Sequence, residues 1–406
     1  MRPARMNRSV FRISLSVCLF VVGAACFHTA SAQAFRNPPE SAAALSLLGG
    51  HYALLDDPSA LSFNPANLGW QEDVEALASV TMVFPDVKFR SPLGFRESAD
   101  DDTVFLPNMH AVVPLKDNLV AGVGVTTPFG QSTKWSKTGP VSMLAPYHAE
   151  LLTMKVNPTL IARVSDELAL SASVDMFYSE LELRQTLPFG RVKLKGDDTA
   201  VGGTFGETWK PMKKHTLGVA YHLGADMKYD GDTHITGFQK SDFDSEIKLP
   251  AILGLGYALD VTDTLRVGVD VEWMEWSRND TLPLDLGANN ALGLIPGGEI
   301  PQDWDDTWNV GAAAEWQMKP AWVARCGWIY METPIPDSTM APTLPDADRH
   351  VLSVGLGYEN ENHAVDLAYA YNIIDDNSID SNQNPLYNGK YEIDSQLLNV
   401  SYAYTF

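Results

Sequence analysis

The sequence predicts an all-β protein, a transmembrane antiparallel β-barrel of about 14 strands with an N-terminal hatch, or plug, inside the lumen. Three observations lead to this fold class. The chain opens with an export signal, a series of alternating segments follows from Glu75, and the last strand alternates strictly up to Phe406. We therefore divide the chain into a signal peptide (1–32), a hatch (33–74) and a transmembrane barrel (75–406).

Residues 1–32 have the three parts of a secretory signal peptide. Four arginines and no acid precede or open a mostly apolar stretch, residues 13–27, and Ala30-Ser31-Ala32 supplies the small-residue cleavage site. The apolar stretch is too short for a comfortable membrane helix, and no later run approaches about 18 apolar residues. An exported chain without membrane helices is periplasmic, secreted or an outer-membrane barrel.

The composition indicates a fold that closes without disulfides. Two of the three cysteines, Cys18 and Cys26, lie in the signal, so the mature chain keeps only Cys326 and has no internal disulfide. The net charge is −22, and loss of the four signal arginines takes the mature protein to about −26. This excess of acids argues against nucleic acid or anionic lipid as a general partner and places the acids in water, in loops and lumen.

Residues 33–74 break the strand pattern. They contain a helix-prone run, residues 41–48, and then Asp56-Asp57-Pro58, with no alternation. Such a segment is either a periplasmic extension or a plug inside the barrel. Its apolar content favours burial and hence a plug; the residues concerned are Leu54, Leu55, Leu61, Phe63 and Leu68.

From Glu75 onward the chain reads as alternating segments separated by clusters of Asp, Asn, Gly and Pro. In residues 264–273, for example, the odd-numbered positions are apolar and the even-numbered ones are polar or small, so one face suits lipid. The predicted strands are 75–89, 107–115, 119–129, 149–164, 167–185, 202–212, 216–230, 246–259, 264–276, 306–317, 320–332, 349–360, 363–374 and 389–406. Their even number and their length match tilted membrane strands.

The connections differ in length as those of an outer-membrane barrel do. Short turns such as 164–166 and 260–263 are expected on the periplasmic side. Long external loops are expected at 186–201, 231–245, 277–305, 333–348 and 375–388.

The last strand carries the lipid-facing pattern most clearly. Leu398, Val400, Tyr402, Tyr404 and Phe406 share one face, and the residues between them share the other. Aromatic residues at the end suit the interfacial girdle of a membrane barrel. From these residues alone, an edge strand of a soluble antiparallel sheet is the alternative.

Several short segments together resemble the outer-membrane long-chain fatty-acid transporter family, the FadL-type hydrophobic channels. In chain order they are Asp56-Asp57, Asn64-Pro65-Ala66, Pro107-Asn108-Met109-His110, Pro128-Phe129-Gly130, Leu249-Pro250, Trp276-Ser277, residues 333–337, residues 344–349 and the terminal Phe406. Each is weak alone, but their order covers nearly the whole mature chain. The resemblance implies a monomeric fourteen-stranded barrel closed by a hatch. Apolar substrates are captured between external loops, held in an internal pocket and released sideways through a gap beside a kinked third strand.

The resemblance also assigns two motifs. Asn64, Pro65 and Ala66 correspond to the hatch signature, and Pro128, Phe129 and Gly130 fall where the kink of the lateral gate belongs. The physical interpretation agrees, because proline cannot donate to a strand ladder and glycine tolerates a bulge. The alternative is an ordinary strand end that turns into the loop at 130–148.

The external capture groove is the least secure part of the resemblance, because the segments at 186–201 and 231–245 are shorter than expected for the family. Apolar surface for capture or for the pocket is expected from Phe63, Phe189, Phe205, Phe238 and Phe243, which would equally serve to cap the barrel rim. Candidate partners for a substrate carboxylate are Arg184 and Arg325. A salt bridge in the lumen wall is the alternative role for Arg325.

No motif of a hydrolase, metalloprotease, redox dithiol or phosphate loop occurs, so we expect no enzyme activity, cofactor or metal. We predict passive uptake of long-chain fatty acids or similar hydrophobic compounds, in a setting of outer-membrane lipid and lipopolysaccharide. Aromatic-hydrocarbon or alkane uptake is the alternative within the family. A general porin, an outer-membrane lipase and a soluble binding protein are the alternatives outside it.

Overall fold

The computed structural model describes residues 34–100, 102–188, 190–375 and 377–406. The predicted signal peptide and Phe189 lie outside these residues. The strands are β1 (Glu75–Arg90), β2 (Arg96–Ser98), β3 (Val104–Lys116), β4 (Leu119–Lys134), β5 (His148–Arg163), β6 (Leu168–Leu187), β7 (Gly190–Met212), β8 (His215–His222), β9 (Ala225–Ile235), β10 (Ser241–Leu249), β11 (Ile252–Asp260), β12 (Leu265–Met274), β13 (Thr281–Asp285), β14 (Glu299–Pro301), β15 (Thr307–Lys319), β16 (Trp322–Met331), β17 (Arg349–Glu359), β18 (His363–Ile374), β19 (Asn377–Ile379) and β20 (Gly389–Thr405). The helices are short: α2 (Ala42–Ser46), η1 (Pro58–Ser62), η2 (Pro65–Trp70), η3 (Val141–Met143), η4 (Trp276–Arg278), η5 (Gly287–Leu292), η6 (Pro296–Gly298) and η7 (Pro385–Tyr387).

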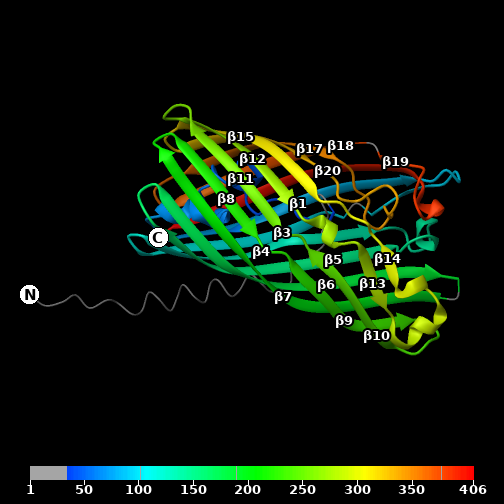
Figure 1. Cartoon of the computed structure of the whole chain (residues 1–406). Coiled ribbons are helices and arrows are strands. Elements are labelled where there is room, and N and C mark those ends of the chain that lie inside the picture. The colour runs from blue at the N-terminus through cyan, green and yellow to red at the C-terminus, as the bar shows by residue number, and fades with distance from the viewer. Residues whose placement is uncertain (1–33, 101, 189, 376) are drawn as a thin grey trace, which may run out of the picture.

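The strands form one closed antiparallel barrel (Figure 1). Consecutive pieces β8 and β9, β10 and β11, and β12 and β13 each make one wall strand, and β2, β14 and β19 are short additions outside the wall. The wall therefore has fourteen strands. It closes where β1 pairs with β20 over its whole length, from Glu75 opposite Thr405 to Arg90 opposite Lys390. All fourteen predicted strands are found, which confirms the predicted fold class.

Two of the predicted external loops are wrong. Residues 186–201 are not a loop, because β6 and β7 pair without interruption up to Leu187 opposite Gly190. Residues 231–245 likewise belong mostly to the paired strands β9 and β10. Both hairpins rise above the part of the wall that faces lipid, so their outward side chains are polar and do not repeat the membrane pattern.

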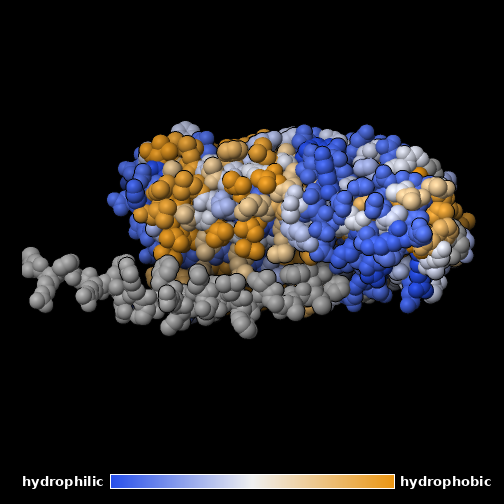
Figure 2. All heavy atoms as spheres, turned by 90° about the horizontal axis from the view of Figure 1, so that it is seen from below, coloured by the Kyte–Doolittle hydropathy of each residue, from blue (hydrophilic) through white to orange (hydrophobic). Residues whose placement is uncertain are grey.

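On the face shown in Figure 2, hydrophobic side chains gather over the half of the barrel near the C-terminus, and the other half is mostly hydrophilic. This band comes from outward residues of the wall strands, such as Leu170, Val174 and Met176 on β6. On the same strand the next outward residues after Tyr178 are acids, Glu180 and Glu182. Among the residues described, no helix is long and apolar enough to cross a membrane.

Residues 34–74, which we call the lumen segment, pack inside the barrel. Ser41 caps helix α2 by accepting a hydrogen bond from the backbone of Ala44, and the five residues of the helix are buried. Close approach to the wall depends on inward-facing glycines. A Cβ on Gly254 would lie 1.9 Å from the Tyr52 ring, and one on Gly311 would lie 2.6 Å from Gly49, so neither position leaves room for a side chain.

Candidate functional site

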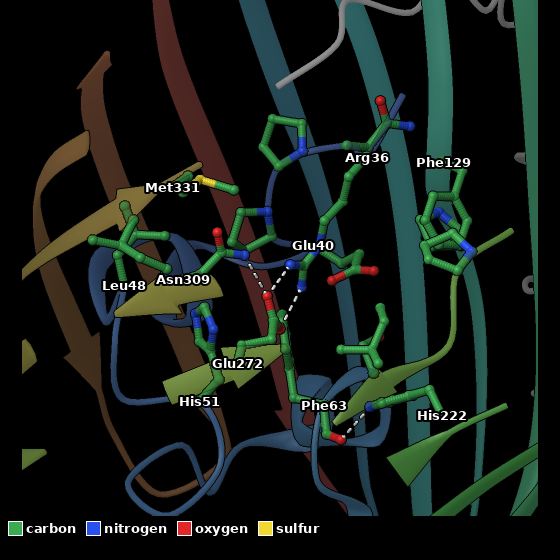
Figure 3. A pocket seen from close by; sticks show the side chains of 18 of the residues that line it. Arg36, Glu40, Leu48, His51, Phe63, Phe129, His222, Glu272, Asn309 and Met331 are labelled. Carbon is green, nitrogen blue, oxygen red and sulfur yellow. Dashed lines mark hydrogen bonds and ion pairs between the residues drawn. The ribbon is translucent and has the colours of Figure 1, made fainter. Parts of the chain in front are cut away.

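A cavity of about 100 Å³ lies in the middle of the barrel, above the lumen segment (Figure 3). Its walls come from the lumen segment and from twelve of the strands, β4, β5, β6, β8, β10, β11, β12, β15, β16, β17, β18 and β20. Apolar surface is provided by Leu45, Leu48, Phe63, Phe129, Phe177, Leu223, Leu249, Ile252, Ile329 and Met331. Six charged side chains also reach it: Arg36, Glu40, Lys155, Asp175, Asp270 and Glu272.

The strongest polar contact of the cavity joins the lumen segment to β12. Arg36 holds Glu272 with both guanidinium nitrogens, one of them 3.0 Å from the carboxylate (Figure 3). Glu272 also accepts hydrogen bonds from the Tyr52 hydroxyl and from the Asn309 amide, the latter at 2.8 Å. A buried carboxylate with this many donors is fully satisfied, so Glu272 has no capacity left for a ligand.

Lys155 on β5 is different, because its charge has no direct partner. The residue is 4% exposed and lines the cavity, yet within the described chain its ammonium takes part in no hydrogen bond or ion pair. Asp175 is already bonded to the hydroxyls of Ser173 and Thr204, each at 2.7 Å. Burial raises the pKa of Glu40, against the opposing charges of Lys155 and Arg36, so this acid is a weak counter-charge.

Two histidines tie the lumen segment together and to the wall. His51 Nε2 lies 2.8 Å from the carbonyl oxygen of Ala44, and burial lowers the pKa of His51 to about 4. It is therefore neutral at physiological pH. His222 at the end of β8 bonds the carbonyl oxygen of Phe63 at 2.9 Å (Figure 3).

The strand ladder parts at Pro128. Strand β4 pairs with β3 only up to Val125, and its ladder with β5 has a bulge between Thr126 and Phe129. The free edge of β4 is met from inside by the lumen segment, where Asn37 donates to the Pro128 carbonyl at 3.0 Å. The Gly130 amide in turn donates to the Phe35 carbonyl at 2.7 Å. A donorless residue thus interrupts the wall, and residues 35–37 occupy the interruption.

An aromatic cluster lies beside this interruption. Phe35 packs edge-on against Trp276, with ring centroids 4.7 Å apart, and Phe129 and Trp304 complete the group. The indole nitrogen of Trp276 is buried without a hydrogen-bond partner. The cluster is therefore held by apolar packing alone around that ring.

The external end of the barrel carries an apolar groove of about 520 Å³. Much of its lining is leucine, contributed by the β6–β7 hairpin, by β13 and by the loops around them: Leu144, Leu183, Leu187, Leu194, Leu284, Leu286 and Leu294. A groove of this composition can bind an apolar chain from the outer surface.

The candidate residues predicted from the sequence are distributed over the whole molecule. Asn64 is fully buried and its amide bonds the Tyr52 and Glu207 carbonyls at 2.8 and 3.0 Å; Pro65 and Ala66 follow it in η2. Phe63 and Phe129 line the cavity. Arg184 is paired with Glu182 on the outer part of β6, and Arg325 with Glu315 and Asp366.

The other predicted phenylalanines do not come together. Phe243 is buried in the apolar core of the outer half, whereas Phe205 points out of the wall on β7 and Phe238 is in the β9–β10 turn. Neither arginine, Arg184 or Arg325, lines the central cavity or the groove.

Sequence reasoning missed Lys155 and the Arg36–Glu272 pair. A signal for Lys155 was present, because the outward positions of its strand, Leu152, Met154 and Val156, are apolar. The parity of the strand therefore places Lys155 in the lumen at mid-span, where an ionisable residue indicates function.

Comparison with known proteins agrees with this architecture. The family described as "Outer membrane protein transport protein (OMPP1/FadL/TodX)" matches residues 23–406. The long-chain fatty acid transport proteins of Salmonella typhi and Escherichia coli K12 are 20% and 21% identical, each covering 88% of this chain and 90% of that protein. A Pseudomonas aeruginosa FadL homologue superposes with a TM-score of 0.81 at 22% identity, over 92% of this chain and all of the other. The Ralstonia pickettii toluene transporter TbuX has a TM-score of 0.71 at 18% identity, over 90% and 98%. The chain belongs to the OMPP1/FadL/TodX family of outer-membrane transport proteins.

Proposed function

We propose that this protein takes up long-chain fatty acids passively across the outer membrane, and that Lys155 is the partner of the substrate carboxylate. The observation that carries this proposal is the buried, unpaired ammonium of Lys155 in the wall of the central cavity. An isolated buried charge is costly, so it persists where binding uses it. A substrate carboxylate would give the Lys155 ammonium a charge-assisted hydrogen bond, whereas a hydrocarbon has no group that could do so.

Affinity for the acyl chain does not depend on this contact. Burial of each methylene contributes about 0.8 kcal/mol, so a chain of about fifteen gains on the order of 12 kcal/mol as an upper limit. The apolar side of the cavity, which includes Phe63, Phe177 and Leu249, suits the part of the chain next to the carboxylate, because about 100 Å³ is too small for all of it. We therefore assign selection of the acid to Lys155 and most of the affinity to the chain.

The route begins in the leucine-lined groove, continues to the central cavity and leaves sideways beside β4. The parted ladder at Pro128 supports this exit, since it is the point where the wall lacks continuous pairing. Release into lipid keeps the chain out of water and costs little, whereas release into water would forfeit the gain. Opening requires residues 35–37 to leave the β4 edge.

The test of the carboxylate assignment is Lys155→Met, measured with a long-chain fatty acid and with its methyl ester. Loss of a hydrogen bond to a charged group, about 1.5–3 kcal/mol, predicts that the acid binds roughly 10- to 150-fold more weakly. The ester should bind at least as well as before. Lys193→Met on the outer part of β7 is the control. Equal losses for acid and ester would show that Lys155 does not read the carboxylate.

The test of lateral release is the double substitution Pro128→Val and Gly130→Thr. Residues that favour continuous pairing should restore the ladder and strongly lower uptake of the acid, while barrel assembly and binding at the outer groove persist. Undiminished uptake by a correctly assembled double variant would leave the periplasmic end of the lumen as the route.

Uptake of monoaromatic hydrocarbons is the second candidate. The aromatic cluster of Phe35, Phe129, Trp276 and Trp304 favours it, because planar rings pack well on such surfaces. Under this function toluene would bind with an affinity that Lys155→Met leaves unchanged, and the fatty acid would bind no better than its ester.

A further inference from the structure

The barrel wall has a second interruption, between β7 and the joint of β8 and β9. On one edge, β7 pairs with β6 without a break. On the other edge, residues 192–197 pair with β9 and residues 204–212 pair with β8, but residues 198–202 have no partner in register. The Leu223 amide donates to the Gly203 carbonyl at 2.8 Å, which marks the lower end of the interruption. A side chain crosses part of this stretch instead, since the Lys228 amide donates to the Asp198 carboxylate at 2.6 Å.

The cavity reaches this interruption from inside. Seven of the residues that line the cavity come from the strands and joints around it: Asp175, Phe177, His222, Leu223, Leu249, Pro250 and Ile252. Leu223 is also 41% exposed, and Val201, on β7 beside the interruption, is 68% exposed. One leucine side chain thus belongs both to the lining of the cavity and to the accessible surface.

Two glycines of β7 face Leu223 here, so at these two positions no side chain of β7 backs the leucine. A Cβ added to Gly203 would lie 3.5 Å from the Leu223 side chain, and one added to Gly202 would lie 3.2 Å from the Leu223 carbonyl oxygen. Across the joint, Arg278 donates to the Leu249 carbonyl at 2.8 Å and to Asp226 at 2.6 Å. Leu223 covers the opening, and the Arg278–Asp226 pair fixes the strand ends beside it.

The two interruptions are closed by different means. At β4 the backbone of residues 35–37 fills the free edge with hydrogen bonds. At β7, within the part of the chain that the structure describes, residues 199–202 are in register with no strand on the edge away from β6. Rotation of one apolar side chain needs far less rearrangement than withdrawal of a paired strand.

We infer that this second interruption is a side passage for apolar chains between the central cavity and the surrounding lipid, gated by Leu223. The inference rests on the proposed function and deepens it, because the substrate then has two ways through the wall. Outward apolar residues continue along β7 up to Val201, so the passage opens at the upper edge of the lipid-facing band.

The passage is tested by cross-linking its two sides. In a Cys326→Ser background, Thr199→Cys and Lys228→Cys lie opposite each other if the register of residues 192–197 is continued, and a short bifunctional thiol reagent joins them. The control is Glu207→Cys with Val219→Cys, two outward residues that lie opposite each other on the paired strands β7 and β8. We expect fatty-acid uptake to fall in part when the first pair is joined, because the exit beside β4 stays open, and not to change when the control pair is joined. Equal uptake by both cross-linked proteins would overturn the inference.

A second measurement does not depend on fatty acid. Leu249→Cys, in the same Cys326→Ser background, places a thiol in the cavity, where we expect it to react with a maleimide confined to lipid. Adding Leu223→Trp should block that reaction. If wild-type protein takes up no fatty acid but labelling responds as stated, the substrate assignment fails and the passage stands. Labelling that Leu223→Trp leaves unchanged would refute the passage, whatever the substrate.

Discussion

Near the periplasmic turns the lumen segment is joined to the wall by hydrogen bonds and ion pairs, whereas in the outer half the lumen is closed by packed aromatic rings. In the first region Asn64 bonds two backbone carbonyls and Arg266 bonds Asp56, Glu315 and the Leu54 carbonyl. In the second, the side chains of Phe35, Phe129, Trp276 and Trp304 pack ring against ring. A hydrophobic ligand can replace an apolar contact in kind but cannot replace a hydrogen bond. The outer half is therefore built to part for substrate, and the inner half to stay closed.

We expect the largest effect from removing most of the lumen segment, which closes the inner half of the barrel. Deleting residues 36–70 should give a folded but leakier barrel, because the wall closes through β1 and β20 without the lumen segment. Conductance in planar bilayers and heat-modified gel mobility measure the two properties. Shortening the external loop at 287–298 is the control. If the truncated protein assembles and conducts no better than the intact one, the lumen segment does not keep the inner half closed.

The second-largest effect is expected from Arg36→Met, which weakens the junction between the two halves. It leaves the Glu272 carboxylate buried without its cation, a loss of about 3–5 kcal/mol in the stability of the closed lumen segment. Hydrogen exchange of backbone amides in the lumen segment reports this change. The double variant with Glu272→Gln should recover much of it. Additive losses in the double variant would mean that the two side chains do not act as a pair.

Asn64→Ala should have a smaller effect confined to the inner half. The Tyr52 and Glu207 carbonyls lose a donor, at about 1–3 kcal/mol for each group left unsatisfied. Exchange should rise around η2 and not at Phe35. Asn64→Asp keeps the size of the side chain and removes its donors, so it should raise exchange at the same positions as Asn64→Ala. Normal protection in the aspartate variant would show that packing, and not donation, holds this site.

Trp276→Phe should have the smallest effect. The indole nitrogen has no partner, so its removal forfeits no hydrogen bond and offsets part of the lost packing. Trp135→Phe is the matched case, because the Trp135 indole donates to the Pro342 carbonyl at 3.0 Å. The free energy of unfolding should fall by about 1 kcal/mol more for Trp135→Phe than for Trp276→Phe. The reverse order would show that Trp276 has a polar partner.

The fourteen wall strands were predictable because lipid imposes one rule, apolar outward, on every span. The prediction failed at residues 190–200 because that rule inverts where the strands leave the membrane band. There Val192 and Leu194 face inward and are buried, while Lys193 and Lys195 face outward. A search for strands whose outward residues are apolar assigns such a strand to a loop, although its side chains still alternate with a period of two.

The site was predictable only in part. Strand parity places Lys155 and Glu272 in the lumen, but parity does not tell which of them the lumen segment neutralises. That outcome depends on Arg36, which lies more than two hundred residues before Glu272 and belongs to a segment without periodicity. The kink at Pro128 was expected from its missing donor, whereas its occupation by residues 35–37 is a tertiary contact that no local pattern encodes.

The contacts of the lumen segment also constrain the order of folding. The segment is synthesised before the wall, yet Tyr52 fits against Gly254 and Gly49 against Gly311, on strands made much later. Contacts between residues so far apart in the chain form slowly, since a long loop must close first. Until then Leu45, Leu54 and Leu61 have no wall to pack against, although all three are fully buried in the finished barrel. Delivery of the chain must therefore keep this segment from aggregating until β20 meets β1, and the rate of barrel closure sets how long that protection is needed.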